Sequence, residues 1–271
     1  MVIEHRYTHG HHCSVLRSHS NRTIANSAAY LAPHLHEGAT LLDVGAGPGT
    51  ITADFAGRVA RVTATEINDA ALALSRAHAA EQGVMNVDFV VADVHALPFA
   101  DGSFDIVHAH QVLQHVADPV QALREMARVA KPGGVVAVRD ADYSGFIWYP
   151  QLPELDDWLS LYLTAARANG GEPDAGRRLL AWAHAAGLRG GVASASVWNY
   201  ADESSRQWWG GMWADRILQS TLTTQLLDSG MADHARLQSI SDAWRAWAAS
   251  PDGWFLLPNG ELLWRKPQAA S

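Results

Sequence analysis

The sequence contains a single cysteine, Cys13, and no long apolar run. One cysteine excludes an internal disulfide and any metal site built from several thiolates, and it favours a reducing compartment. No apolar stretch approaches the roughly 18 residues that a membrane-spanning helix needs. The first twelve residues lack the apolar core of a secretion signal. We therefore expect a cytoplasmic protein without a membrane partner.

Positive charge is also scarce, because the chain has 28 acidic and 20 basic residues, which give a formal net charge of −8. Proteins that bind the phosphate backbone of nucleic acid usually present a basic face. This balance argues against a nucleic-acid partner. The remaining composition, 48% hydrophobic and 18% charged, is that of an ordinary globular chain.

Tryptophan is absent from the first 147 residues, and all 11 tryptophans lie at or after Trp148. The Trp-free part alternates apolar runs with helical patterns. Runs typical of buried parallel strands lie at 39–45, 61–67, 87–93, 104–110 and 135–141. Helices are expected at 20–36, 51–57, 68–83 and 118–134, where capping residues and glycine stops support the last two. This alternation predicts an α/β fold, with a mostly parallel sheet and helices on both faces.

The Trp-rich part follows a different pattern. It predicts helices at 153–170 and 174–187, a strand at 191–200, two or three helices within 202–249, and a hairpin over 253–266 that turns at Pro258-Asn259-Gly260. We divide the chain into an N-terminal lid and helix (1–36), a ligand-binding core (37–145) and a remainder (146–271) with a helical cap at about 201–252.

A glycine-rich loop, Asp43-Val44-Gly45-Ala46-Gly47-Pro48-Gly49-Thr50, joins the first strand to a helix. Glycines let the backbone turn tightly and approach a ligand closely, although a tight turn alone would also explain them. The spacing G-x-G-x-G differs from the dinucleotide pattern G-x-G-x-x-G, and Pro48 removes one amide donor. Asp43 would repel a phosphate and attract an ammonium or a sulfonium. The loop therefore favours a ligand with a cationic centre.

Two further acids end the next two strands. Glu66 is placed to accept hydrogen bonds from the hydroxyls of a ribose, and Asp93 to accept one from an adenine amino group. Taken singly, Glu66 could cap the next helix and Asp93 could form a turn. Three acids at three consecutive strand ends after a glycine loop indicate one ligand site.

The segments 41–50, 62–68, 90–119 and 123–134 resemble the class I S-adenosylmethionine (SAM)-dependent methyltransferases. They are most similar to the ubiquinone- and menaquinone-biosynthesis C-methyltransferases. The resemblance implies SAM as cofactor and a Rossmann-like sheet of seven strands, the last antiparallel. It implies cofactor contacts from Tyr7, Asp43, Gly45, Ala46, Gly47, Gly49, Thr50, Glu66, Ile67, Asp93, Val94, His110 and Gln111.

The opening segment 7–20 resembles a lid over cofactor and substrate in some members of this family, and Tyr7 is carried over from it. Family members that modify nucleobases carry an Asn/Asp-Pro-Pro-aromatic motif after the fourth strand. Here that place holds His108-Ala109-His110-Gln111, which argues further against nucleic-acid methylation.

Methyl transfer from a sulfonium is an in-line displacement, so the enzyme mainly aligns the groups and excludes water. A hydroxyl, ring carbon or protonated amine must also lose a proton to a base, for which histidine suits neutral pH. His110, at the end of the fourth strand, is the first candidate, and His11 and His12 follow. His110 could instead only hydrogen-bond the backbone or the cofactor. No cysteine or acid near His9, His11 and His12 completes a metal site, so we expect none.

Four tryptophans are candidates for an aromatic-walled pocket, although core packing would explain them too: Trp148, Trp208, Trp209 and Trp213. We predict a SAM-dependent methyltransferase that acts on a small molecule, either a specialised metabolite or an aromatic, quinone-like compound. The alternatives are a protein or peptide methyltransferase, a SAM-binding regulator without turnover, and a nicotinamide-dependent oxidoreductase. The oligomeric state is open, with a homodimer as the candidate.

Overall fold

The computed structural model describes residues 21–268. These residues form two compact units, which are considered separately. The sheet unit comprises residues 21–140, 175–196 and 260–268, and the aromatic unit comprises residues 141–174 and 197–259. Two long strands, β7 (Val192–Tyr200) and β8 (Trp254–Arg265), contribute residues to both units.

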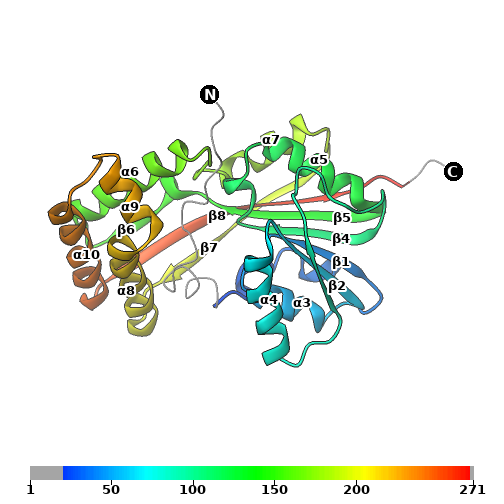
Figure 1. The fold of residues 1–271 in the computed structure, drawn as a ribbon, viewed down its shortest axis with the longest axis horizontal. Coiled ribbons are helices and arrows are strands. Elements are labelled where there is room, and N and C mark those ends of the chain that lie inside the picture. Colours follow the sequence, from blue (N-terminus) through cyan, green and yellow to red (C-terminus); the bar gives the residue numbers. More distant parts are fainter. Residues whose placement is uncertain (1–20, 269–271) are drawn as a thin grey trace. The chain divides into compact units, whose positions relative to one another are not determined.

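The sheet unit contains the parallel sheet expected from the apolar runs (Figure 1). Its strands are β1 (Thr40–Val44), β2 (Arg61–Glu66), β3 (Val87–Val91), β4 (Phe104–His110) and β5 (Ala130–Ala141). They lie in the order β3-β2-β1-β4-β5, and every neighbouring pair is parallel. The strand order reverses at β1, so ligands are expected beside its carboxyl end and that of β4.

The last strand, β8, pairs with β5. Gly133 donates its backbone N–H to Lys266, which in turn donates to Gly134, each at 2.9 Å. Farther along β5, Arg139 pairs with Glu261 of β8, which precedes Lys266 in the chain. Residue numbers therefore rise along one strand as they fall along the other, and the antiparallel last strand is confirmed. Within residues 21–268 eight strands are assigned, including β6 (Ile147–Tyr149) of only three residues.

The hairpin predicted over 253–266 is wrong, because these residues form one continuous strand. A tight turn would need positive φ angles, which Asn259 and Gly260 do not have. Asn259 is instead fully buried, and its side-chain amide donates to the carbonyl of Leu257 at 3.2 Å. A Cβ on Gly260 would lie 2.0 Å from the backbone oxygen of Gly176. The glycine therefore permits close packing of two backbones and not a turn.

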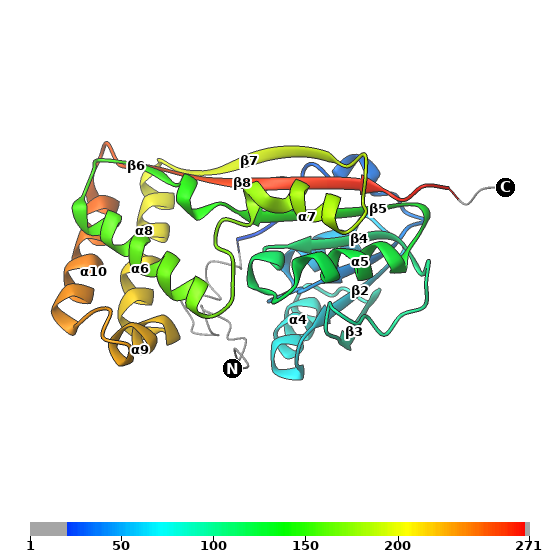
Figure 2. The ribbon, with the colours of Figure 1, turned by 90° about the horizontal axis from the view of Figure 1, so that it is seen from above.

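Helices cover both faces of the sheet, with α3 and α4 on one side and α5 and α7 on the other (Figures 1 and 2). The helical segments of this unit are α2 (Ile24–Ser27), η1 (Ala32–His34), α3 (Thr50–Ala56), α4 (Asp69–Glu81), η2 (Leu113–His115), α5 (Pro119–Val129), η4 (Gly176–Arg178) and α7 (Leu179–Ala185). Asn68 and Asp118 cap α4 and α5 through their side chains, as expected.

Three predicted helices of this unit are shorter in the structure. The helix expected at 20–36 is wrong, because α2 has only four residues. Pro33, which cannot continue a helix from the preceding turn, lies in the separate 3-10 turn η1. Helix α5 ends at Val129, since Ala130 already pairs with Phe104 as the start of β5. The helix expected at 174–187 begins at Leu179, after the turn η4.

The aromatic unit contains the helices α6 (Pro153–Ala168), α8 (Glu203–Gln219), α9 (Thr221–Asp228) and α10 (His234–Ala249), the short turn η3 (Tyr143–Gly145) and strand β6. Three helices within 202–249 agree with the sequence pattern. Their core is a cluster of rings around Phe255, with Trp158, Trp213, Trp244 and Trp247 fully buried. Among residues 21–268, no helix is both long and apolar enough to cross a membrane.

Helices α8 and α10 approach closely at Gly210. A Cβ there would lie 2.8 Å from Ala248 Cβ and 2.8 Å from the carbonyl oxygen of Trp244. The next residue of the same helix, Gly211, has no neighbouring atom within 4 Å of a Cβ. The two glycines thus have opposite surroundings at adjacent positions.

We expect Gly210→Ala to lower the free energy of unfolding by about 1–3 kcal/mol, because the helices must move apart. Gly211→Ala should raise it by up to about 1 kcal/mol, since alanine is the better helix former. Urea unfolding of both variants measures the difference. Equal effects at the two positions would contradict the close approach of α8 and α10.

Candidate active site

The glycine loop between β1 and α3 needs glycine for two reasons. Gly45, Gly47 and Gly49 have φ angles of 67°, 58° and 82°, in the region that other residues rarely adopt. Space is also limited, since a Cβ on Gly45 would lie 2.5 Å from the Val112 side chain and one on Gly49 2.9 Å from Ser75 Cα. Positive φ angles and close neighbours therefore both require glycine in this tight turn.

Asp43 lies at the base of this loop and is buried. One carboxylate oxygen accepts a hydrogen bond from Thr52 Oγ1 at 2.6 Å, and the other pairs with His108 Nδ1 at 2.9 Å. Because a carboxylate only accepts, Nδ1 of His108 carries the shared hydrogen. Both oxygens thus bind side chains of α3 and β4. Any attraction of a cationic ligand by Asp43 would therefore have to act through the charge of its carboxylate. That attraction stays a prediction.

Glu66 reaches from the end of β2 to the glycine loop. Its Oε1 accepts a hydrogen bond from the backbone N–H of Gly47 at 2.7 Å, which places the carboxylate directly beside the loop. Ile67, the next residue, is 61% exposed. A tight glycine turn with an adjacent carboxylate fits a ligand that carries a ribose.

Asp93 follows the end of β3, and Val94 after it is buried. The Asp93 carboxylate accepts hydrogen bonds from the backbone N–H of His95 at 2.9 Å and pairs with its ring Nδ1 at 2.6 Å. Partial burial raises the pKa of Asp93, but these hydrogen bonds and the charge of His95 outweigh it, so the pKa lies below its usual range. Asp93 therefore offers an ionised acceptor at this strand end.

The end of β4 brings His110 and Gln111 to the same edge of the sheet as the loop. His110 is only 6% exposed and lies opposite Arg139 in the β4–β5 register. Gln111 has a φ of 54° and is the only non-glycine residue between 21 and 268 with a positive φ. Its backbone N–H donates to the Arg139 carbonyl at 2.7 Å, and its side chain accepts from Arg22 at 2.6 Å. Such backbone strain tends to occur at functional sites.

The structure adds a residue that the sequence reasoning missed, Asp140 near the end of β5. It is fully buried, and its Oδ1 accepts a hydrogen bond from the backbone N–H of Gln114 at 3.0 Å. Its Oδ2 has no hydrogen-bond partner among residues 21–268. Burial raises the pKa of Asp140 to about 7, against the lowering effects of Gln114, Leu113 and Arg139. The strand-end rule applied to Glu66 and Asp93 could have found it.

A buried ion pair lies on β5 beside Asp140. Arg139 is fully buried and donates from Nε to Ser196 Oγ at 3.1 Å, with Glu261 Oε1 at 3.4 Å. Glu261 also accepts hydrogen bonds from Ser194 at 2.8 Å and from Ser196. The Tyr30 hydroxyl is buried near this pair, and burial followed by the charge of Glu261 raises its pKa well above the usual value. The carboxyl edge of the sheet thus holds several buried ionisable groups.

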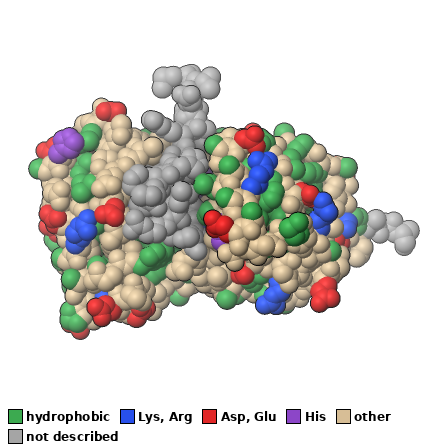
Figure 3. Space-filling view, turned by 60° about the horizontal axis from the view of Figure 1, so that its bottom comes forward, with side chains coloured by type: hydrophobic (Ala, Val, Ile, Leu, Met, Phe, Trp, Pro, Cys, Tyr) green, Lys and Arg blue, Asp and Glu red, His purple; other side chains and the backbone are tan. Residues whose placement is uncertain are grey.

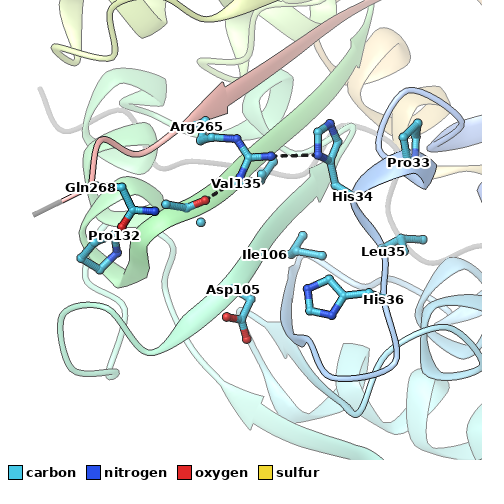
Figure 4. Close-up of a pocket in the computed structure, with 12 residues that line it drawn as sticks. Pro33, His34, Leu35, His36, Asp105, Ile106, Pro132, Val135, Arg265 and Gln268 are labelled. Carbon is cyan, nitrogen blue, oxygen red and sulfur yellow. Dashed lines mark hydrogen bonds between the residues drawn. The ribbon is translucent and has the colours of Figure 1, made fainter.

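A cavity of about 370 Å³ lies in the sheet unit near the amino ends of β4 and β5, which is the opposite end of these strands from the glycine loop. Figure 4 shows Arg265 hydrogen-bonded to His34 beside it, at 3.1 Å. Burial and the charge of Arg265 lower the pKa of His34. None of the residues predicted to bind cofactor or substrate lines this cavity.

Three of the four predicted pocket tryptophans are core residues of the aromatic unit. Trp148, Trp209 and Trp213 are at most 5% exposed and belong to the ring cluster around Phe255. Trp208 is half-buried and lies against Tyr200 with 5.8 Å between ring centres. Of the four, only Trp208 therefore has a partly accessible ring.

The predicted lid residues Tyr7, His11 and His12 lie outside the described residues, as does His9. Among residues 21–268, no three His, Cys, Asp or Glu side chains are grouped as a metal site would require.

Comparison with known proteins identifies the family. A family model described as "Methyltransferase domain" matches residues 42–138. An uncharacterised methyltransferase of Schizosaccharomyces pombe is 33% identical over 274 residues, which cover 97% of each chain. The chain belongs to the SAM-dependent methyltransferases. Its cofactor is SAM, and the nicotinamide-dependent oxidoreductase is set aside.

Other relatives agree with this family. The ubiquinone/menaquinone biosynthesis C-methyltransferase of Klebsiella pneumoniae is 41% identical over 108 residues, 38% of this chain and 43% of that enzyme, which confirms the predicted similarity. The YcgJ protein of Bacillus subtilis shares the fold, with a TM-score of 0.56 and 22% identity over 96% of this chain and 100% of its own. Phosphoethanolamine N-methyltransferase 2 of Haemonchus contortus, solved with S-adenosylmethionine, has a TM-score of 0.51 and 16% identity over 86% of this chain and 50% of its own.

The buried Asp140 makes the stability of this methyltransferase depend on pH. The pKa of the native carboxyl, about 7, lies above the value of about 3.9 for an unfolded chain, so the native state binds more protons between these pH values. Stability should therefore fall as the pH rises through this range. Asp140→Asn removes the titration but retains an acceptor oxygen.

We expect the unfolding free energy of the wild type to fall by about 2–3 kcal/mol relative to Asp140→Asn between pH 5 and pH 8. Urea unfolding at both pH values measures this change. Asp101→Asn, at a carboxylate whose side chain is 80% exposed, is the matched control and should follow the wild type. Parallel pH curves for wild type and Asp140→Asn would show that the Asp140 carboxyl titrates normally.

Proposed function

We propose that this methyltransferase transfers the methyl group of SAM to a small-molecule acceptor by in-line displacement. The observation that supports a small acceptor is the burial of the sheet edge at which the strands end. His110 is 6% exposed, and Arg139 and Asp140 are fully buried. A protein or peptide acceptor would need an open groove, and a closed, dry site suits a small molecule.

We assign the cofactor to the glycine loop and the acids beside it. Gly45 and Gly47 form a tight turn with positive φ angles, Glu66 offers acceptors for ribose hydroxyls, and Asp93 with Val94 suits the adenine end. SAM supplies a methyl group activated by a positively charged sulfur. The contribution of the chain is to orient both partners, exclude water and accept a proton at the strand ends.

Charge supports the same assignment over a nucleic-acid acceptor. In the face shown in Figure 3, Lys and Arg side chains lie singly and are interspersed with Asp and Glu. No basic stripe for a phosphate backbone is seen there. Within the small molecules we favour an aromatic, quinone-like compound or a specialised metabolite. This preference rests on the partial match to the quinone-biosynthesis C-methyltransferase.

The single cysteine supports a reducing compartment, and on that ground we propose the cytoplasm. A homodimer is the assembly proposed for testing by light scattering. A regulator without turnover would bind SAM but label no acceptor.

A transfer assay tests the proposed function. SAM with a radiolabelled methyl group is incubated with the protein and with separate panels of phenols and quinols, small amines, peptides, and RNA. We expect label in a phenol, quinol or small amine and none in peptides or RNA. Label in peptides or RNA alone would refute the small-molecule acceptor. SAM binding without label in any panel would favour the regulator.

Two tryptophans of α8, Trp213 and Trp208, test a packing role and a role in acceptor binding separately. Trp213→Ala should lower the unfolding free energy by about 3–5 kcal/mol, because its ring is fully buried among Trp158 and Trp244. Trp208→Phe should cost less than about 1.5 kcal/mol, since the ring is half-buried. For the acceptor that becomes labelled, we expect Trp208→Phe to change KM at least threefold with SAM affinity unchanged. An unchanged KM would remove Trp208 from the proposed pocket.

A further inference from the structure

One carboxylate oxygen of Asp140 accepts a hydrogen bond, and the other has no partner among residues 21–268. Oδ1 accepts the backbone N–H of Gln114, in the turn η2 that follows His110 and Gln111. Oδ2 is buried and has no hydrogen-bond partner in the described part of the chain. An asparagine at this position would cap the same turn through its carbonyl oxygen. Capping therefore does not account for an ionisable side chain here.

A buried carboxyl with an unused oxygen is costly to the fold. Removing a carboxylate from water without a compensating partner costs several kcal/mol, which native proteins mostly avoid. Groups of this kind concentrate where chemistry is done. Asp140 lies at the carboxyl edge of the sheet, where β5 follows β4, and this edge is also where the cofactor has been proposed to bind.

The nearest fixed positive charge does not satisfy Asp140. Arg139 directs its Nε to Ser196 and Glu261, so it already has a carboxylate partner. Among residues 21–268, Arg139 and Tyr30 interact electrostatically with Asp140. Asp43 and Glu261 interact with the same Tyr30, and His110 lies opposite Arg139 in the β4–β5 register. Because Arg139 is already paired with Glu261, the Asp140 carboxyl is suited to a positive charge that a ligand brings. The two forms of the cofactor differ in this respect, because the methyl donor carries a sulfonium and its product is a neutral thioether.

We propose that Asp140 distinguishes the methyl donor from its product by charge, losing its proton when the sulfonium is bound and regaining one when the thioether has formed. This inference rests on the proposed position of the cofactor at the glycine loop. A nearby positive charge lowers the pKa of a carboxyl by about 1–3 units, enough to ionise Asp140 at neutral pH.

The protons balance over one turnover. Asp140 releases its proton to solvent as the donor binds. During the transfer, the bond between the methyl carbon and sulfur breaks with its electron pair on sulfur, while a bond forms to the acceptor atom, which loses a proton. Asp140 takes up one proton and is neutral when the product leaves. The positive charge therefore ionises the carboxyl at the stage when a base is required.

Calorimetry tests this without an acceptor. SAM and S-adenosylhomocysteine are each titrated into the full chain at pH 7 in phosphate and in Tris, whose ionisation enthalpies differ, so that the proton change can be calculated. With wild type we expect SAM to release about half a proton more than the product, since an acid at its pKa is half protonated. The affinity ratio of SAM to product should rise about five- to tenfold from pH 6 to pH 8.

Variants assign the effect to one side chain. Asp140→Asn should bind both forms with equal proton changes and a ratio that is independent of pH, whereas Asp101→Asn should behave as wild type. Equal proton changes in the wild type, or a difference that persists in Asp140→Asn, would overturn the inference. If Asp140→Asn does not fold, the wild-type pH series decides alone. Failure of both ligands to bind would instead refute the proposed cofactor site.

Discussion

The buried hydrogen bonds of Asp43 are the constraint on which the rest of the site depends. Its carboxylate binds Thr52 of α3 and His108 of β4, at 2.6 and 2.9 Å, and none of the three residues is more than 3% exposed. A buried carboxylate must be paired, so these contacts fix the end of β1 relative to α3 and β4. The glycine loop runs between β1 and α3. Its position, and with it the place of Glu66 beside Gly47, follows from this pairing.

Much of the sheet unit could be predicted because its signals are local. A strand of five to seven apolar residues, an Asn or Asp cap and a glycine stop are each visible within a short window, and β1 to β4 lie where the pattern indicates. The partners of Asp43 could not be predicted in this way. Asp43 and His108 are 65 positions apart and meet only through the parallel pairing of β1 and β4.

The wrong hairpin and the misassigned tryptophans also come from contacts between residues that are distant in the sequence. Pro258-Asn259-Gly260 is a turn sequence by local preference, but Gly260 is required by its contact with Gly176, on a segment more than 80 positions earlier. The tryptophans show a related difficulty, because helical spacing places residues on one face without indicating what that face meets. Trp209 and Trp213 share a face of α8, and this face turns out to pack into the ring cluster. Composition separated the two parts of the chain but could not distinguish a core from a pocket.

Several features of the sheet unit cost stability, and they lie at the same edge of its sheet. The glycine loop gives up side chains, Gln111 adopts a left-handed backbone, and Asp140 is buried with one oxygen unused. A fold selected only for stability would favour a glycine at position 111 and an apolar or amide side chain at position 140. Their presence at the carboxyl ends of β1, β4 and β5 is best explained by a ligand that compensates for them when it binds. A cation fits this explanation, since the groups at this edge include the Asp140 carboxyl, whose Oδ2 has no hydrogen-bond partner among residues 21–268, while the neighbouring Arg139 is already paired with Glu261.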